Sequence, residues 1–184
     1  MENTVKIPKF LHEIHGDESN WFDIIATHSV ALITVFGTVY LANPLELQSW
    51  KTILLIILAY DLGGGVLANF TYSTNWYYEQ ASIRRKVFLA LHVLQPFFMI
   101  LVFPEYLNEI LVYAAYTLAS SFRTNAIKDV RTQLIAGSFF SLTGIIVLHS
   151  LSSSIEATLS LLFTLFLLKL PLSFSVRWYR LKGF

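Results

Sequence analysis

The 184-residue chain contains no cysteine. Disulfides, thiolate metal sites, iron–sulfur clusters and a cysteine nucleophile are therefore excluded. Charge is also scarce, at 14% of residues, and the formal net charge of +1 gives no general attraction to nucleic acid. No basic tract interleaved with aromatic residues occurs, so no nucleic acid is expected as a partner. The first twenty residues carry four acidic side chains and lack the continuous apolar core of a secretory signal peptide.

Long apolar stretches make up most of the chain. Hydrophobic residues account for 55% of it, whereas a soluble domain has about 45–50%. A membrane-spanning helix needs about 20 mostly apolar residues, and six stretches come near that length. They are residues 22–42, 50–72, 87–103, 107–122, 134–149 and 157–176. The sequence predicts an all-α fold, a polytopic integral membrane bundle of six transmembrane helices in one domain over residues 1–184, with the lipid bilayer as its partner.

Positive charge is distributed unevenly between the ends of these stretches. Lysine and arginine residues precede the first stretch and follow the second, fourth and sixth, whereas the opposite ends are acidic, with Lys51 as their only cation. Because lysine and arginine mark the cytoplasmic side, both termini are predicted to be cytoplasmic, in a plasma or inner membrane. Residues 1–20 form a cytoplasmic or interfacial segment. Within it, residues 5–15 fit either a short amphipathic interfacial helix or a disordered tail.

Two ionisable side chains fall deep within the predicted spans. Asp61 lies near the middle of the second span, and Lys169 lies at comparable depth in the sixth. Each alone would cost about 2.5–3.5 kcal/mol on insertion scales, and such residues tend to be functional. As a pair they fit a proton or cation relay or a substrate counter-ion. The alternatives are a static ion pair that locks two helices, or a lysine that reaches the cytoplasmic interface without meeting Asp61.

Three consecutive glycines follow the aspartate in the second span. Helical spacing of four places Asp61, Gly65 and Asn69 on one face. Gly63, Gly64 and Gly65 weaken a helix interior, which predicts a discontinuous helix whose exposed backbone lines a site near the membrane midplane, as in many transporters. The alternative is close helix packing through small residues.

The third predicted span places polar residues beside a proline. His92, Gln95 and Pro96 fall on one helical side. Pro96 has no backbone N–H to donate to the carbonyl of His92, so a kink is predicted there. A histidine beside a kink fits a ligand or a proton carrier; the alternative is a histidine satisfied by a neighbouring helix.

His28 in the first span lies at a depth similar to that of His92 in the third. Two histidines on different helices fit a metal site or the two faces of a haem. His12 and His15, one helical turn apart, are possible additional ligands. No HExxH and no Glu-x-x-His occurs on a span, so a zincin or a di-iron bundle is not supported.

These features predict a polar cavity between the first, second, third and sixth spans, open toward the cytoplasm. Its expected lining is His28, Asp61, Asn69, His92, Gln95 and Lys169. Three hypotheses for function follow. The first is transport or proton-coupled movement of a small solute or ion, with a homodimer supplying the symmetry that the missing internal repeat does not. The second is a metal- or haem-dependent membrane enzyme acting on a lipophilic substrate, and the third is an accessory or assembly subunit.

Overall fold

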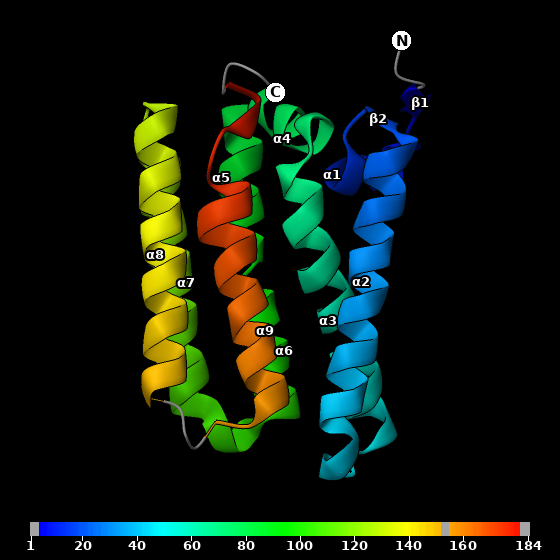
Figure 1. The fold of residues 1–184 in the computed structure, drawn as a ribbon, viewed down its shortest axis with the longest axis vertical. Helices are drawn as coiled ribbons and strands as arrows, with labels where there is room; N and C mark the ends of the chain where they lie inside the picture. Colours follow the sequence, from blue (N-terminus) through cyan, green and yellow to red (C-terminus); the bar gives the residue numbers. More distant parts are fainter. Residues whose placement is uncertain (1–3, 152–154, 181–184) are drawn as a thin grey trace.

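Long helices lie side by side along one axis of the molecule (Figure 1). The computed structural model describes residues 4–151 and 155–180. Among these residues, five helical stretches are long and apolar enough to cross a membrane. They are Trp21–Leu45, Ser49–Phe70, Ile83–Val102, Val130–Ser150 and Ala157–Arg180. The prediction of an all-α, multi-pass membrane protein is therefore confirmed.

The helical elements follow each other with short connections. The long ones are α2 (Trp21–Ala42), α3 (Ser49–Phe70), α5 (Ser82–Leu91), α6 (Leu94–Val102), α7 (Leu107–Ala126), α8 (Val130–Leu151) and α9 (Ala157–Leu167). A π-helical segment, Leu168–Phe174, continues α9, and α4 (Tyr72–Glu79) lies at one end of the bundle (Figure 1). Short 3-10 turns are found at Asn43–Leu45, Pro104–Tyr106 and Trp178–Arg180.

Side chains cap several helix starts. The Asn20 side chain accepts a 2.7 Å hydrogen bond from the backbone nitrogen of Asp23 at the start of α2. The Thr71 side chain accepts from Thr74 at the start of α4. The carboxylate of Glu156 accepts hydrogen bonds from the backbone nitrogens of Thr158 and Leu159 in the first turn of α9. The helix dipole also stabilises a negative charge at this end of a helix. Because these caps satisfy backbone donors that have no partner in their own helix, they fix where each helix begins.

Large apolar side chains cover the outside of the bundle. On α2, Phe22, Ile33 and Phe36 are 79%, 69% and 72% exposed. Exposed apolar surface of this extent is unfavourable in water and is what a lipid environment requires. The continuous α9 and π-helical segment lies in the middle of the bundle (Figure 1) and contacts α3, α7 and α8.

The predicted fourth span is helical, but α7 is not among the five helices that meet the length and composition of a membrane span. Asn108, Glu109 and Arg123 lower its apolar content. The described residues therefore show five candidate spans rather than the six that were predicted, and the membrane crossing of α7 is part of the proposal below.

The glycine run does not break the helix, and the prediction of a discontinuous second span was wrong. α3 is continuous from Ser49 to Phe70, because two of the glycines are used for close packing against α2. A Cβ at Gly63 would overlap the Thr34 side chain, and one at Gly64 would lie 3.1 Å from Cβ of Ala31. The alternative prediction, close packing through small residues, describes these two positions.

The third span is interrupted one turn before its proline. α5 ends at Leu91 and α6 begins at Leu94, with His92 and Val93 between them. Pro96 lies in the first turn of α6, where a missing N–H is tolerated. The predicted kink is therefore present as a short break at the histidine.

The N-terminal segment is folded and packs against α4. β1 (Thr4–Lys6) and β2 (Glu18–Asn20) form an antiparallel pair that encloses a 3-10 turn (Lys9–Leu11) and α1 (His12–His15). Neither alternative predicted for residues 5–15 describes this arrangement. Sequence reasoning missed it because three-residue strands and a one-turn helix leave no recognisable periodicity.

Candidate functional site

An ion pair between a buried lysine and a half-exposed aspartate joins α3 to the π-helical segment. Asp61, near the middle of α3, accepts a hydrogen bond of 2.8 Å from Nζ of Lys169. Its second carboxylate oxygen accepts a hydrogen bond from Nε2 of Gln95 on α6. The side chain of Lys169 is 2% exposed and that of Asp61 is 51% exposed. The pair therefore presents its carboxylate, rather than its ammonium group, to the surrounding space.

Two local features make room for the Lys169 side chain. A Cβ at Gly65 would lie 2.8 Å from Nζ of Lys169, so any larger residue there requires the lysine side chain to move. Lys169 itself lies in the π-helical segment, which ends with the backbone nitrogen of Ser175 donating to the carbonyl of Leu170, five residues earlier. π-helical turns within longer helices are frequent at functional sites.

A cavity of about 460 Å³ lies beside the ion pair. Its lining includes all six residues that the sequence assigned to a shared cavity, namely His28, Asp61, Asn69, His92, Gln95 and Lys169. They come from α2, α3, α6, the break before α6, and the π-helical segment. Much of the remaining wall is apolar, with Ile57, Leu58, Leu91, Leu94 and Phe98. A mainly apolar cavity with a few convergent polar groups is the usual form of a small-molecule site.

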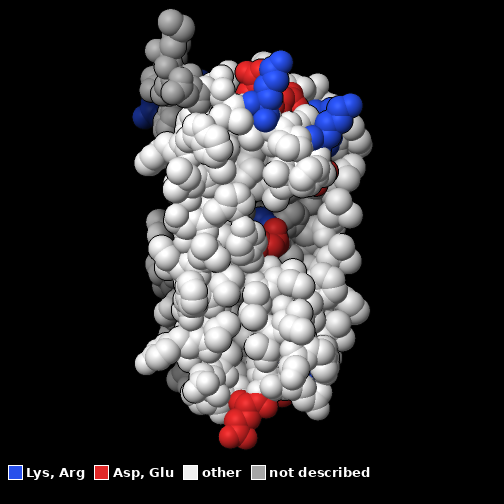
Figure 2. Space-filling model, turned by 90° about the vertical axis from the view of Figure 1, so that its right-hand side faces the viewer, with Lys and Arg blue, Asp and Glu red and all other residues white. Residues whose placement is uncertain are grey.

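The cavity is open on the side of the bundle. Figure 2 shows a hollow midway between the charged ends of the molecule, with acidic and basic atoms on its floor. The sequence predicted an opening toward the cytoplasm, whereas this opening lies halfway along the helices. Glu13 and Ile14 of the N-terminal segment also line the cavity, so the segment borders it on the side of α4.

Three residues that line the cavity carry buried polar atoms without a hydrogen-bond partner in the described part of the chain. They are Thr27 (Oγ1), Asn69 (Nδ2) and Gln95 (Oε1). Since a carboxylate only accepts, the amide nitrogen of Gln95 faces Asp61 and its oxygen is the atom left over. An unpaired buried polar atom costs about 1–3 kcal/mol. Such atoms are usually satisfied by water or by a bound molecule.

His92 adds a further acceptor to the same wall. Its Nδ1 lies 2.6 Å from the backbone oxygen of Phe88. Because a carbonyl oxygen only accepts, Nδ1 carries the proton in the neutral ring, which leaves Nε2 as an acceptor. The carboxylate of Asp61 and Nε2 of His92 thus supply acceptors near each other on the cavity wall, and Oε1 of Gln95 is a further acceptor that is buried next to Asp61.

His28 has partners other than His92. Its Nε2 lies 3.1 Å from Nε2 of His15, and its Nδ1 lies 2.6 Å from the hydroxyl of Tyr60. A metal on His28 would displace one of these bonds. In the described ranges, no three His, Cys, Asp or Glu side chains group together as metal ligands. His28 and His92 both line the cavity, and His92 is hydrogen-bonded to the backbone of Phe88, so the predicted pair of metal ligands stays a prediction.

The N-terminal segment is held to α4 by hydrogen bonds that sequence reasoning missed. The hydroxyls of Tyr78, Thr74 and Ser73 donate to the carbonyls of Glu13, Ile14 and His15, respectively. Burial lowers the pKa of His15, and the neighbouring His28 lowers it further. Burial raises the pKa of Tyr78. The only signal in the sequence was the run of hydroxyl residues in α4, which fits capping equally well.

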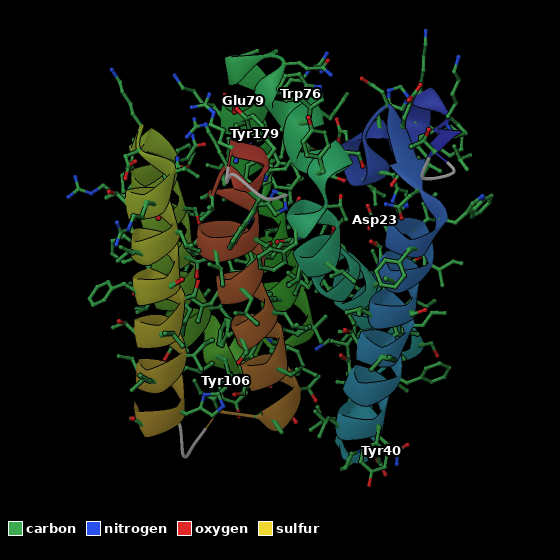
Figure 3. All side chains as sticks on the ribbon, turned by 45° about the horizontal axis from the view of Figure 1, so that its top comes forward. Asp23, Tyr40, Trp76, Glu79, Tyr106 and Tyr179 are labelled. Carbon is green, nitrogen blue, oxygen red and sulfur yellow. The ribbon has the colours of Figure 1, made fainter. Side chains whose placement is uncertain are left out.

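A cluster of charged side chains closes the end of the bundle near α4. The carboxylate of Glu79 lies 4.0 Å from Arg85, 3.0 Å from Arg177 and 2.7 Å from Arg180. Arg85 is 2% exposed and also donates to Oδ1 of Asn125. Figure 3 shows Glu79 beside Trp76 and Tyr179 at this end. The sequence predicted lysine and arginine residues at this end. It did not indicate that a single acidic residue, Glu79, forms ion pairs with three arginines.

No known protein family, curated protein or solved structure matches the chain.

Proposed function

We propose that the chain is a small membrane transporter that moves a small solute in exchange for protons. The observation that carries this proposal is the half-exposed carboxylate of Asp61 on the floor of a mid-bundle cavity, paired with a buried ammonium group. Ionisable residues inside a membrane are costly and commonly mark substrate or proton pathways.

The ion pair is the switch in this mechanism. A proton on Asp61 removes its negative charge and weakens its attraction to Lys169. A solute that donates to Asp61 competes with that proton, because one carboxylate cannot hold both. Occupancy by proton and by solute therefore exclude each other, which is the requirement for coupled exchange.

Two flexible points lie next to this switch. α5 and α6 are interrupted at His92 and Val93, and Lys169 lies in the π-helical segment. Pro96 has no N–H to donate to the carbonyl of His92, and the π-helical segment ends in a bond that spans five residues, so each is a place where a helix bends at low cost. Bending there would change access to Asp61 from one side of the membrane to the other.

The proposal places six helices across the membrane, α7 among them, with both termini in the cytoplasm. Figure 3 shows Trp76 and Tyr179 at one end of the bundle and Tyr40 and Tyr106 at the other. Aromatic residues at both ends fit the two interfaces of a bilayer, and the lysine and arginine bias assigns the cytoplasmic one.

The cysteine-free chain permits a direct test of this topology. Glu105→Cys and Lys128→Cys place single thiols at the two ends of α7. In intact cells, a membrane-impermeant maleimide is expected to label the first and to reach the second only after permeabilisation. Labelling of both from the same side would show that α7 does not cross.

Transport is tested in proteoliposomes that enclose a pH indicator. A panel of small cationic, neutral and anionic solutes is added outside, and the internal pH is followed. The wild-type protein is expected to change the internal pH with at least one class of solute. The Asp61→Asn/Lys169→Met double variant, which removes both charges together, is expected to match empty liposomes. A panel without any response in the wild type would overturn the proposal.

A second candidate function is an enzyme acting on a lipophilic substrate. The side opening of the cavity and the acceptor Nε2 of His92 favour it, because a base beside an apolar cavity fits proton abstraction. Elemental analysis of the purified protein, compared with a His28→Ala/His92→Ala variant, tests the metal-dependent form. Stoichiometric metal that disappears in the variant would favour the enzyme, and its absence from both would favour transport.

A further inference from the structure

We infer that the solute is a lipophilic amine, bound through its ammonium group at Asp61 and entering from the side of the bundle. The inference rests on the proposed function and names its substrate class. It follows from the charge, the acceptor count and the position of the cavity.

The charge of the cavity favours a cation. Among the described residues that line it, the acids are Asp61 and Glu13, and Lys169 is the one permanently charged base. Lys169 is 2% exposed, so it cannot approach an anionic ligand without leaving Asp61. The carboxylate of Asp61 is 51% exposed and keeps lone pairs beyond those used by Lys169 and Gln95. A ligand in the cavity therefore meets negative charge first.

The hydrogen-bonding pattern favours an ammonium head. An ammonium group has donors and no acceptor. The wall near Asp61 offers two acceptors to it, the half-exposed carboxylate and Nε2 of His92. Oε1 of Gln95, which has no partner in the described part of the chain, is buried and becomes a third acceptor when the Gln95 side chain moves. A carboxylate or phosphate ligand would place its acceptors against these acceptors. A hydroxyl head would satisfy fewer of them, because it has a single donor.

The apolar wall excludes a bare inorganic ion and requires an organic body. Ca²⁺ takes about 6–8 oxygen ligands, and the described residues contain no such cluster. Ile57, Leu91 and Leu94 are 57%, 54% and 48% exposed and line the cavity beside its acidic floor. An alkyl or aryl group bound there removes its apolar surface and theirs from water.

The position of the opening indicates entry from the bilayer. The hollow in Figure 2 lies midway between the charged ends of the molecule, flanked by uncharged surface. The uncharged form of a lipophilic amine dissolves in the hydrocarbon core, from which an opening at this depth is reached directly. Glu13, on the N-terminal segment, adds negative charge along the cavity toward α4.

A matched set of three ligands tests the inference by binding alone. Naphthylethylamine, naphthylethanol and naphthylacetate share an aromatic body and differ in their polar head. Binding is measured by equilibrium dialysis against the full chain in nanodiscs of neutral lipid, with empty nanodiscs correcting for partition into lipid. The amine is expected to bind at least about 10-fold more tightly than the alcohol or the acid, since a hydrogen bond to a charged group exceeds a neutral one by roughly that factor.

Two variants locate the binding. Asp61→Asn/Lys169→Met is expected to reduce the preference for the amine to less than about threefold. Gln95→Met keeps the ion pair and the side-chain volume while removing one acceptor, so it remains informative if the double variant does not fold. It is expected to weaken the amine about 3- to 10-fold and to leave the acid unchanged. Glu105→Gln, at the opposite end of the bundle, is the matched control and is expected to bind like the wild type.

The outcomes separate the substrate class from the transport function. Tightest binding by the alcohol or the acid, or equal binding of all three, would overturn the amine assignment. So would an unchanged amine preference in both site variants. The proteoliposome assay can still respond to another solute class in those cases. Conversely, amine binding at Asp61 without any pH response would uphold the ligand and overturn transport.

Discussion

Removing one partner of the ion pair at a time should have unequal effects on stability. Asp61→Asn leaves the ammonium group of Lys169, which is 2% exposed, buried without its counter-charge. Breaking a buried pair in this way costs about 3–5 kcal/mol. Lys169→Met leaves the carboxylate of Asp61, which is 51% exposed and keeps its bond from Gln95. Because that carboxylate remains partly solvated, the expected cost is about 1.5–3 kcal/mol, the value of one hydrogen bond to a charged group.

The double variant Asp61→Asn/Lys169→Met should recover much of the larger loss. Replacing a buried ion pair with uncharged groups of similar volume is often neutral or stabilising, because neither charge then has to leave water. We expect the double variant to be about 2 kcal/mol more stable than Asp61→Asn alone. Together with the loss of about 1.5–3 kcal/mol expected for Lys169→Met, this corresponds to a coupling energy of about 3.5–5 kcal/mol, above the roughly 0.5–3 kcal/mol usual for residues in direct contact.

The free energy of unfolding of all four proteins is measured in mixed micelles with increasing SDS, following helix content by circular dichroism. The unfolding free energy must fall with SDS at the same slope in all four proteins before their SDS midpoints are compared. If Lys169→Met were at least as destabilising as Asp61→Asn, the unequal burial of the pair would not control its energetics. If the two losses simply added in the double variant, the side chains would not be in contact.

Three further perturbations test other parts of the structure. Gly65→Ala places a Cβ 2.8 Å from the buried ammonium group and should lower the thermal midpoint, whereas Gly37→Ala, with no atom within 4 Å of the new Cβ, should leave it unchanged or raise it. The N-terminal segment should detach in acid: burial lowers the pKa of His15, so the folded segment binds fewer protons than the unfolded one. Its docking is therefore complete above about pH 6.5 and is lost as the pH falls below that value, which hydrogen exchange of the segment from about pH 8 to about pH 5 can follow. Glu79→Gln should destabilise the protein by about 3–5 kcal/mol in SDS unfolding, because Arg85 is 2% exposed and loses its acidic partner.

Each of these predictions has a result that would contradict it. Equal midpoints for Gly65→Ala and Gly37→Ala would mean that the lysine moves aside without cost. Exchange in the N-terminal segment that responds to acid equally in a His15→Gln variant would assign the effect to another group. If Glu79→Gln lowered the free energy of unfolding by less than about 1 kcal/mol, the charge cluster would contribute no more to stability than an exposed salt bridge does.

The fold was predictable to the extent that apolar length determines it. The helices α2, α3, α8 and α9 coincide with predicted spans because about 20 apolar residues leave helix as the only structure in lipid. The glycine run in α3 was mispredicted because the prediction used the low helix propensity that glycine has in water. Packing of Gly63 and Gly64 against α2 outweighs that propensity, as tertiary contacts often do.

The grouping of the cavity residues was predictable from depth and helical phase. Asp61 and Asn69 share a face of α3 at spacing eight, and Lys169 lies at the depth of Asp61, so a common cavity followed once their helices were adjacent. The role of the N-terminal segment was not predictable. Its contacts use backbone carbonyls of Glu13 and Ile14, which every residue type offers, so no pattern in the sequence distinguishes them.

Three departures from regular helix meet at the ion pair, and their coincidence argues against a purely structural role for it. Gly65 gives up a side chain where Lys169 needs space, the π-helical segment begins one residue before that lysine, and the third span is interrupted at His92 beside the same cavity. Each departure weakens a helix, and the buried pair itself contributes little net stability compared with apolar packing. A bundle selected only for stability would fill this position with leucine and alanine. The same departures leave Asp61 half-exposed on the floor of a cavity with unpartnered acceptors, an arrangement that becomes favourable when a cationic ligand is bound.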